Sequence, residues 1–177
     1  MEILIVAIDH GLQLTRELSD SPQLAAQKDR LEAILSREIP SRNVRFISEE
    51  SDPKKKTIAR KLANDAEPPI SWKNIKMSDE ERDAAGIKDP LKERPGHPDY
   101  DTMTFWIESR IPADIVREGF FIDQTIQSAS DAESIMMLLG DLHVDAVAER
   151  LTKMGHQVET NHDLFPVRRW EEMRDTN

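Results

Sequence analysis

The fold that this sequence predicts depends on MEILIVAID at residues 1–9 and on IMMLL at residues 135–139. Continuous apolar runs of this kind are typical of strands that are buried on both faces of a parallel sheet. A histidine follows each run, His10 after the first and His143 within GDLH at residues 140–143. The pattern therefore predicts two buried strands, each with a histidine near its carboxyl end.

Helical patterns separate these runs from further strand-like segments. Ser21 and Pro22 have the form of a helix N-cap followed by proline, and an apolar face continues until Pro40. Further strands are expected at residues 43–48, 68–75 and 156–159, and further helices at residues 53–63, 78–81, 111–126 and 144–154. Strands that alternate with helices predict an α/β fold with right-handed crossover connections. We therefore expect a single α/β domain over residues 1–177, with a mostly parallel sheet of about five strands flanked by helices.

One long segment does not fit this alternation. Residues 84–110 are largely polar and include RPGHP at residues 94–98. Clusters of proline and glycine interrupt regular structure, and long irregular segments in compact domains are often binding loops or lids. We therefore expect an irregular, lid-like segment at residues 84–110.

Charge and cysteine content limit the chemistry that the chain can perform. Its 177 residues include 34 acidic and 24 basic side chains, which give a formal net charge of −10. This balance disfavours nonspecific binding to nucleic acids, because affinity for the phosphate backbone comes mainly from Lys and Arg. Cysteine is absent, which excludes disulfides, thiolate metal sites and cysteine nucleophiles. Any metal would therefore be held by His, Asp or Glu.

Targeting signals and common catalytic motifs are also missing from the sequence. No window approaches the ~20 apolar residues of a membrane-spanning helix. The first apolar run lacks the basic leader and the small-residue cleavage site of a signal peptide. We therefore expect a soluble, cytoplasmic protein with no membrane partner. The P-loop, dinucleotide-binding, serine-hydrolase and zincin motifs are not found, which disfavours the chemistry that each of them supports.

Candidate site residues follow three of the predicted strands. His10 and His143 follow two of them, and Glu49 and Glu50 follow the strand at residues 43–48, which we expect beside the first strand. The carboxyl ends of parallel strands are where α/β proteins bind ligands, and imidazoles with carboxylates can hold a metal or transfer protons. Each residue also has a structural interpretation, the histidines as turn residues and the glutamates as an acidic helix N-terminus. Because adjacent side chains on a strand diverge, we expect only one glutamate to face the site.

Two arginines lie at the helix expected for residues 111–126. Arg110 comes just before it, and Arg117 lies within it. A guanidinium at the edge of a site could hold a carboxylate, a phosphate or a developing oxyanion. Most arginines are simply surface residues, and this interpretation of Arg110 and Arg117 is the favoured one.

Taken together, these residues resemble the TraB/Tiki and erythromycin-esterase/ChaN-like superfamily. Its members share paired G-x-x-H motifs, a glutamate after the second strand and an arginine at one end of an α/β sheet. The late motif matches at residues 140–143, whereas the early one, AIDH at residues 7–10, has alanine in place of glycine. The resemblance implies His10 as a metal ligand or base and His143 as a ligand. It also implies a glutamate, Glu49 or Glu50, as a ligand or water activator, with Arg110 or Arg117 as the arginine.

The function that follows as an expectation is a metal-dependent hydrolase of amide or ester bonds. His10, His143 and one of the two glutamates would hold a divalent Mn, Zn or Co ion, or would activate water directly. The substrate would be a small molecule or a peptide, and the sequence leaves room for a homo-oligomer. Two alternatives stay open: a noncatalytic partner-binding module of the same fold, and a binding protein for a small ligand or a metal.

Overall fold

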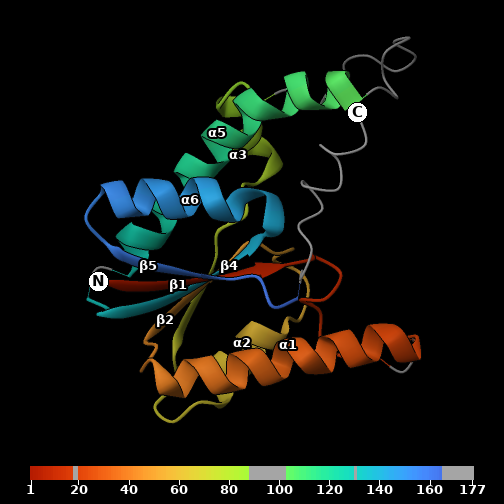
Figure 1. Ribbon diagram of the computed structural model, residues 1–177, viewed down its shortest axis with the longest axis vertical. Coiled ribbons are helices and arrows are strands. Elements are labelled where there is room, and N and C mark those ends of the chain that lie inside the picture. The colour runs from red at the N-terminus through yellow and green to blue at the C-terminus, as the bar shows by residue number, and fades with distance from the viewer. Residues whose placement is uncertain (18–19, 88–102, 130, 165–177) are drawn as a thin grey trace.

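The computed structural model describes residues 1–17, 20–87, 103–129 and 131–164, and of residues 103–112 it describes the backbone alone (Figure 1). Within these residues, five parallel strands form one sheet. The strands are β1 (Glu2–Ile8), β2 (Phe46–Glu49), β3 (Ser71–Asn74), β4 (Ser134–Gly140) and β5 (Gln157–Asn161). The predicted α/β fold, with a mostly parallel sheet of about five strands, is confirmed.

The order of the strands differs from the prediction at one position. The sheet runs β3-β2-β4-β1-β5, so that β4 separates β2 from β1. The expectation that the second strand adjoins the first is therefore wrong. Every residue of β4 from Ser134 to Leu139 is buried, and a strand of this kind is stabilised by neighbours on both sides. As a consequence, the carboxyl end of β4 lies between those of β1 and β2.

Helices cover both faces of this sheet (Figure 1). On one face lie α1 (Pro22–Ser41) and α2 (Ile58–Asp65), and on the other lie α5 (Met103–Ser128) and α6 (Asp141–Lys153), while α3 (Asp79–Ala84) follows β3 along the chain. As predicted, the Ser21 side chain accepts a hydrogen bond from the Leu24 N–H and caps α1. Ser78 and Glu81 form the capping box that begins α3. Each cap satisfies a backbone N–H that would otherwise lack a partner.

The hydrophobic core consists of two layers, one on each face of the sheet. Alternate residues of β1 belong to different layers: Ile3 and Ile5 pack toward Phe121 of α5, whereas Leu4 and Val6 pack toward α1 and α2. This division follows from the alternation of side chains along a strand. It also explains why β1 is apolar at every position from Ile3 to Ile8 rather than at every second one.

Three helices begin at residues other than those that the sequence predicted. α2 begins after Thr57, not near residue 53, because Thr57 accepts from the Arg60 N–H while Asp52 accepts from Lys54 N–H in a separate turn. α5 begins at Met103, so that residues 103–110 of the expected lid-like segment are helical. Residues 88–102 of that segment lie outside the described residues. α6 begins at Asp141, so that His143 lies in its first turn and not in a loop.

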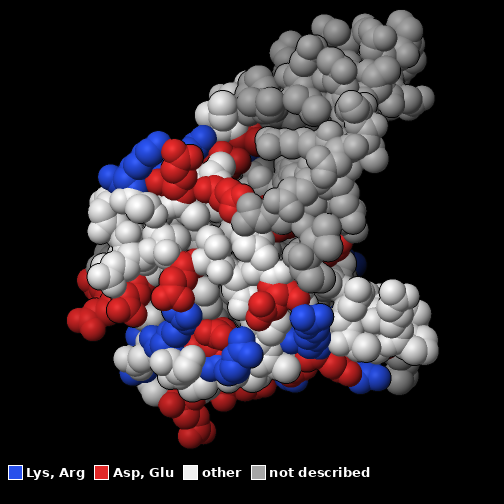
Figure 2. Space-filling model, viewed as in Figure 1, with Lys and Arg blue, Asp and Glu red and all other residues white. Residues whose placement is uncertain are grey.

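The surface drawn in Figure 2 carries acidic and basic side chains close to one another. Two of the ion pairs are Lys61 with Glu32, at 3.0 Å, and Lys153 with Glu149, at 2.5 Å. Exposed pairs of this kind contribute little to stability, about 0–1 kcal/mol each.

Among the helices of the described residues, none combines the length and the apolar character needed to span a membrane.

Candidate active site

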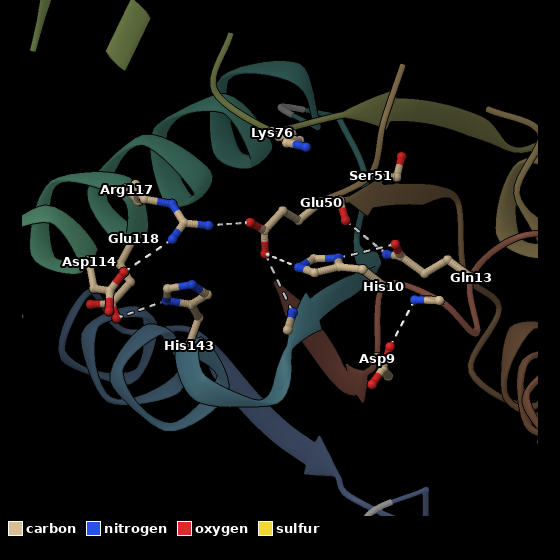
Figure 3. A network of polar contacts seen from close by, with 12 residues as sticks. Asp9, His10, Gln13, Glu50, Ser51, Lys76, Asp114, Arg117, Glu118 and His143 are labelled. Atoms are coloured by element: carbon tan, nitrogen blue, oxygen red, sulfur yellow. Dashed lines mark hydrogen bonds and ion pairs between the residues drawn. The ribbon is translucent and has the colours of Figure 1, made fainter. Parts of the chain in front are cut away.

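The carboxyl ends of β1, β2 and β4 bring together residues that are far apart in the sequence (Figure 3). Glu50 directly follows β2, and its Oε2 lies 3.4 Å from the backbone N of Gly140 and 3.8 Å from Nε2 of His10. A Cβ atom added to Gly140 would lie 3.4 Å from the same Nε2. The last residue of β4 therefore closes one side of a small site in which the imidazole faces the carboxylate.

Glu50 is the centre of this site. Its side chain is 1% exposed, and its backbone N–H extends the ladder between β2 and β4 by donating to the Leu138 carbonyl. Oε1 accepts a hydrogen bond from Nη2 of Arg117 at 2.5 Å. A buried carboxylate without a counter-charge is very unfavourable, and the guanidinium of Arg117 supplies that counter-charge.

Arg117 reaches Glu50 from α5 on the adjacent layer. Its Nη1 donates to Asp114 at 3.1 Å, one helical turn earlier, and its guanidinium lies 5.7 Å from the centre of the Phe121 ring. These contacts fix the orientation of the guanidinium, whose side chain is 25% exposed. Figure 3 shows Glu50 between Arg117 on one side and His10 on the other.

His10 is the accessible member of the site. Its side chain is 57% exposed, and its Nδ1 lies 3.2 Å from Oε1 of Gln13. Its Nε2 points toward Oε2 of Glu50, but the separation of 3.8 Å is longer than a hydrogen bond. The turn that carries His10 is closed by Asp9, which accepts from the Gly11 N–H through its side chain and from the Leu12 N–H through its carbonyl. The imidazole therefore meets solvent and a buried carboxylate at once.

His143 lies in a buried network beside this site. Its Nδ1 is 3.3 Å from Oε1 of Glu118, and the other oxygen of Glu118 is 3.1 Å from Nη2 of Arg150. The side chain is 6% exposed, and its ring meets the Phe121 ring edge to face, with ring centres 5.5 Å apart. In Figure 3 it lies next to α5, on the Arg117 side of the site. His143 thus supports the α5–α6 layer, while His10 faces solvent.

Glu49 points to the opposite face of the sheet from Glu50. Its Oε2 accepts hydrogen bonds from Oγ1 of Thr57 at 2.7 Å and from Nε1 of Trp72 at 2.9 Å. Its Oε1 is buried and has no hydrogen-bond partner in the part of the chain that the structure describes. Burial raises the pKa of Glu49 to about 7, although the bonds from Thr57 and Trp72 act in the opposite direction.

The structure thus brings His10, Glu50 and Arg117 together and places Glu49 on the other face. The side chain of Arg110 lies outside the described residues. Sequence reasoning missed Gln13 and gave no role to Glu118, although a spacing of three residues between His10 and Gln13 is compatible with a contact across a turn. The contact between Glu118 and His143 depends on the packing of α5 against α6, which no local pattern reveals.

The donor atoms at this site fit proton transfer better than they fit a metal ion. Among the described residues, no three His, Asp or Glu side chains are placed to hold a metal together. Glu50 is bound to a guanidinium, whose positive charge would repel a cation, and Nδ1 of His143 faces Glu118. The expected Mn, Zn or Co ion stays a prediction.

Comparisons of this chain with models of known protein families, with curated proteins and with solved structures find no match. The resemblance to the TraB/Tiki and erythromycin-esterase/ChaN-like superfamily therefore stays a prediction.

Proposed function

We propose that this protein is a hydrolase of amide or ester bonds in which His10 takes a proton from the attacking water. The observation that carries this proposal is an accessible imidazole with Nε2 3.8 Å from a carboxylate that is 1% exposed. A neutral imidazole is a base suited to neutral pH, and a nearby carboxylate stabilises the imidazolium that forms when it accepts a proton.

The proposed reaction follows the usual course of acyl transfer to water. As Nε2 of His10 takes the proton, the water oxygen forms a bond to the carbonyl carbon, and the π electrons move onto the carbonyl oxygen. When the tetrahedral intermediate collapses, the bond to the leaving nitrogen or oxygen breaks and His10 returns the proton to that atom. Glu50 stabilises the charged imidazole in between, and Arg117 balances the charge of Glu50.

The contacts of Glu50 favour attack on the substrate by water rather than by the Glu50 side chain. Oε1 of Glu50 is held by Arg117 and Oε2 contacts the Gly140 N–H, so that the carboxylate is committed to these partners. His10, in contrast, is open to solvent on one side. The substrate, a small molecule or a peptide, would approach from that side.

Replacing His10 by glutamine should lower the rate of hydrolysis by about 10²–10⁴-fold, the usual contribution of general acid–base catalysis. The fold should be retained, because the side chain is largely exposed. The measurement is turnover of a panel of nitrophenyl esters and peptide anilides near neutral pH. His156→Gln is the matched control, since His156 lies in the turn between α6 and β5 and its backbone N–H bonds the Leu151 carbonyl.

The same panel distinguishes water activation by His10 from activation by a metal. Turnover that persists in chelator and is lost in His10→Gln supports the proposal. Turnover that requires added Mn²⁺, Zn²⁺ or Co²⁺ would mean that a metal ion, and not His10, activates the water. Full activity in His10→Gln, or no turnover of any substrate by the unaltered protein, would contradict it.

A further inference from the structure

We infer that Gln13 fixes the tautomer of His10, so that Nδ1 carries the ring proton and Nε2 is left as the basic nitrogen. The catalytic meaning of this inference rests on the proposed function. The tautomer itself is a property of the folded protein and can be measured without a substrate. Gln13 is thus a positioning residue that acts through His10.

Gln13 is held in place by partners from three segments. The residue is 2% exposed, and its carbonyl accepts a hydrogen bond of 2.8 Å from the N–H of Ile58, the first residue of α2. Its side-chain Nε2 donates to the Glu50 carbonyl at 2.8 Å, in a buried bond. Its side-chain Oε1 faces Nδ1 of His10 at 3.2 Å. Because the backbone carbonyl and both ends of the side-chain amide have partners, Gln13 has little freedom to turn.

The bond to the Glu50 carbonyl decides which way the Gln13 amide faces. A carbonyl oxygen can only accept, and the amide nitrogen is the only donor that the Gln13 side chain has. If the amide were flipped, two oxygens would stand 2.8 Å apart in a buried position and both would lack a donor. Oε1 must therefore be the atom that faces His10.

The direction of the amide in turn decides the tautomer of His10. Oε1 can only accept, so its contact with Nδ1 is favourable only when Nδ1 carries a proton. In water, neutral histidine prefers to carry its proton on Nε2. Gln13 reverses this preference and leaves Nε2 with a free lone pair.

The position of that lone pair suits a base. In neutral His10, Nε2 and Oε2 of Glu50 are both acceptors, which agrees with their separation of 3.8 Å. Once Nε2 has taken a proton, it becomes a donor that faces an ionised carboxylate. The opposite tautomer would point an N–H at Glu50 from the start and could not accept a proton there. Gln13 therefore prepares the nitrogen that the proposed reaction needs.

The experiment is a long-range ¹H–¹⁵N NMR correlation of the His10 ring, recorded at about pH 9, where histidine side chains are ordinarily neutral. In the unaltered protein we expect Nδ1 to show the shift of a protonated nitrogen and Nε2 that of an unprotonated one. Gln13→Met keeps the length of the side chain and removes the acceptor. It should change the tautomer ratio about fivefold or more in favour of the Nε2–H form, as the loss of one hydrogen bond implies.

Asp9→Ala is the control, because it loosens the same turn by removing the acceptor of the Gly11 N–H and leaves Gln13 intact. It should leave the tautomer of His10 unchanged. An Nε2–H tautomer in the unaltered protein would overturn the inference, whether or not Gln13→Met folds. So would a folded Gln13→Met with an unchanged ratio, or an Asp9→Ala variant with the same shift. If the tautomer behaves as expected and no substrate is hydrolysed, only the proposed function fails.

Discussion

Replacing Arg117 by leucine should lower the free energy of unfolding by about 3 kcal/mol, one of the largest losses that a single substitution outside the hydrophobic core can cause here. The reason is the carboxylate that stays behind. Glu50 is 1% exposed, and Arg117 is the only cation within ion-pair distance of it among the described residues, apart from His10 when protonated. We place the loss at the lower end for buried pairs, because the Arg117 side chain is 25% exposed and solvent can partly replace it.

A double variant shows whether this loss of stability comes from the Glu50 carboxylate that is left without a counter-charge. Glu50→Gln combined with Arg117→Leu removes both charges, so that the double variant should be more stable than Arg117→Leu alone. Arg16→Leu is the matched control. Arg16 also pairs with a carboxylate, that of Asp29 at 3.1 Å, but both side chains are more than half exposed and the loss should stay below about 1 kcal/mol.

Urea unfolding followed by circular dichroism measures all of these differences. Equal losses of stability for Arg117→Leu and Arg16→Leu would contradict the prediction that the buried Glu50–Arg117 pair contributes more than an exposed ion pair. A double variant that is no more stable than Arg117→Leu would show that the loss comes from packing against Phe121 and not from charge.

The fold could largely be predicted because its strongest signals are local. The apolar runs that became β1 and β4 are buried at every position from Ile3 to Ile8 and from Ser134 to Leu139. The caps at Ser21 and Ser78 likewise depend on residues three positions apart. Strand order, in contrast, depends on contacts between distant segments, which is why the position of β4 beside β2 was missed.

The candidate site shows the same limit. Alternation along a strand predicts that Glu49 and Glu50 diverge, but not which of them meets His10. That choice follows from the register of β2 against β4, in which Glu49 pairs with Leu138 and the Glu50 N–H bonds the Leu138 carbonyl. The partnership of Glu50 with Arg117 depends on how α5 crosses the sheet. The sequence can therefore predict which residues share a site, but their roles depend on how the helices pack against the sheet.

Glu49 should make the protein less stable as the pH rises, and Glu49→Gln should remove this effect. Its pKa is about 7 in the folded protein, against an ordinary value of 4.5, because burial disfavours its charged form. The folded state therefore binds a proton more tightly than the unfolded state. The contribution of neutral Glu49 to the stability of the fold is fully present below pH 4.5, and it is lost as the pH rises through 7. The whole loss is on the order of 3 kcal/mol.

Glutamine stays neutral throughout this range, and its oxygen can accept the bonds that Thr57 and Trp72 donate to Glu49. At about pH 8 we expect Glu49→Gln to be more stable than the unaltered protein by about 2 kcal/mol, since the new amide N–H would lack a partner just as Oε1 does. Near pH 4 the gain should vanish or turn into a small loss. The difference between variant and parent isolates Glu49, because every other titrating group is common to both.

Urea unfolding of both proteins at about pH 4 and about pH 8 tests this prediction. Glu133→Gln makes the same change of charge at an exposed position and should alter stability by less than about 0.5 kcal/mol at either pH. If Glu49→Gln changed stability equally at both pH values, Glu49 would be ionised to the same extent in the folded and unfolded states. Water would then have to reach the buried Oε1 of Glu49, and Glu49 would belong to a site that is open to solvent.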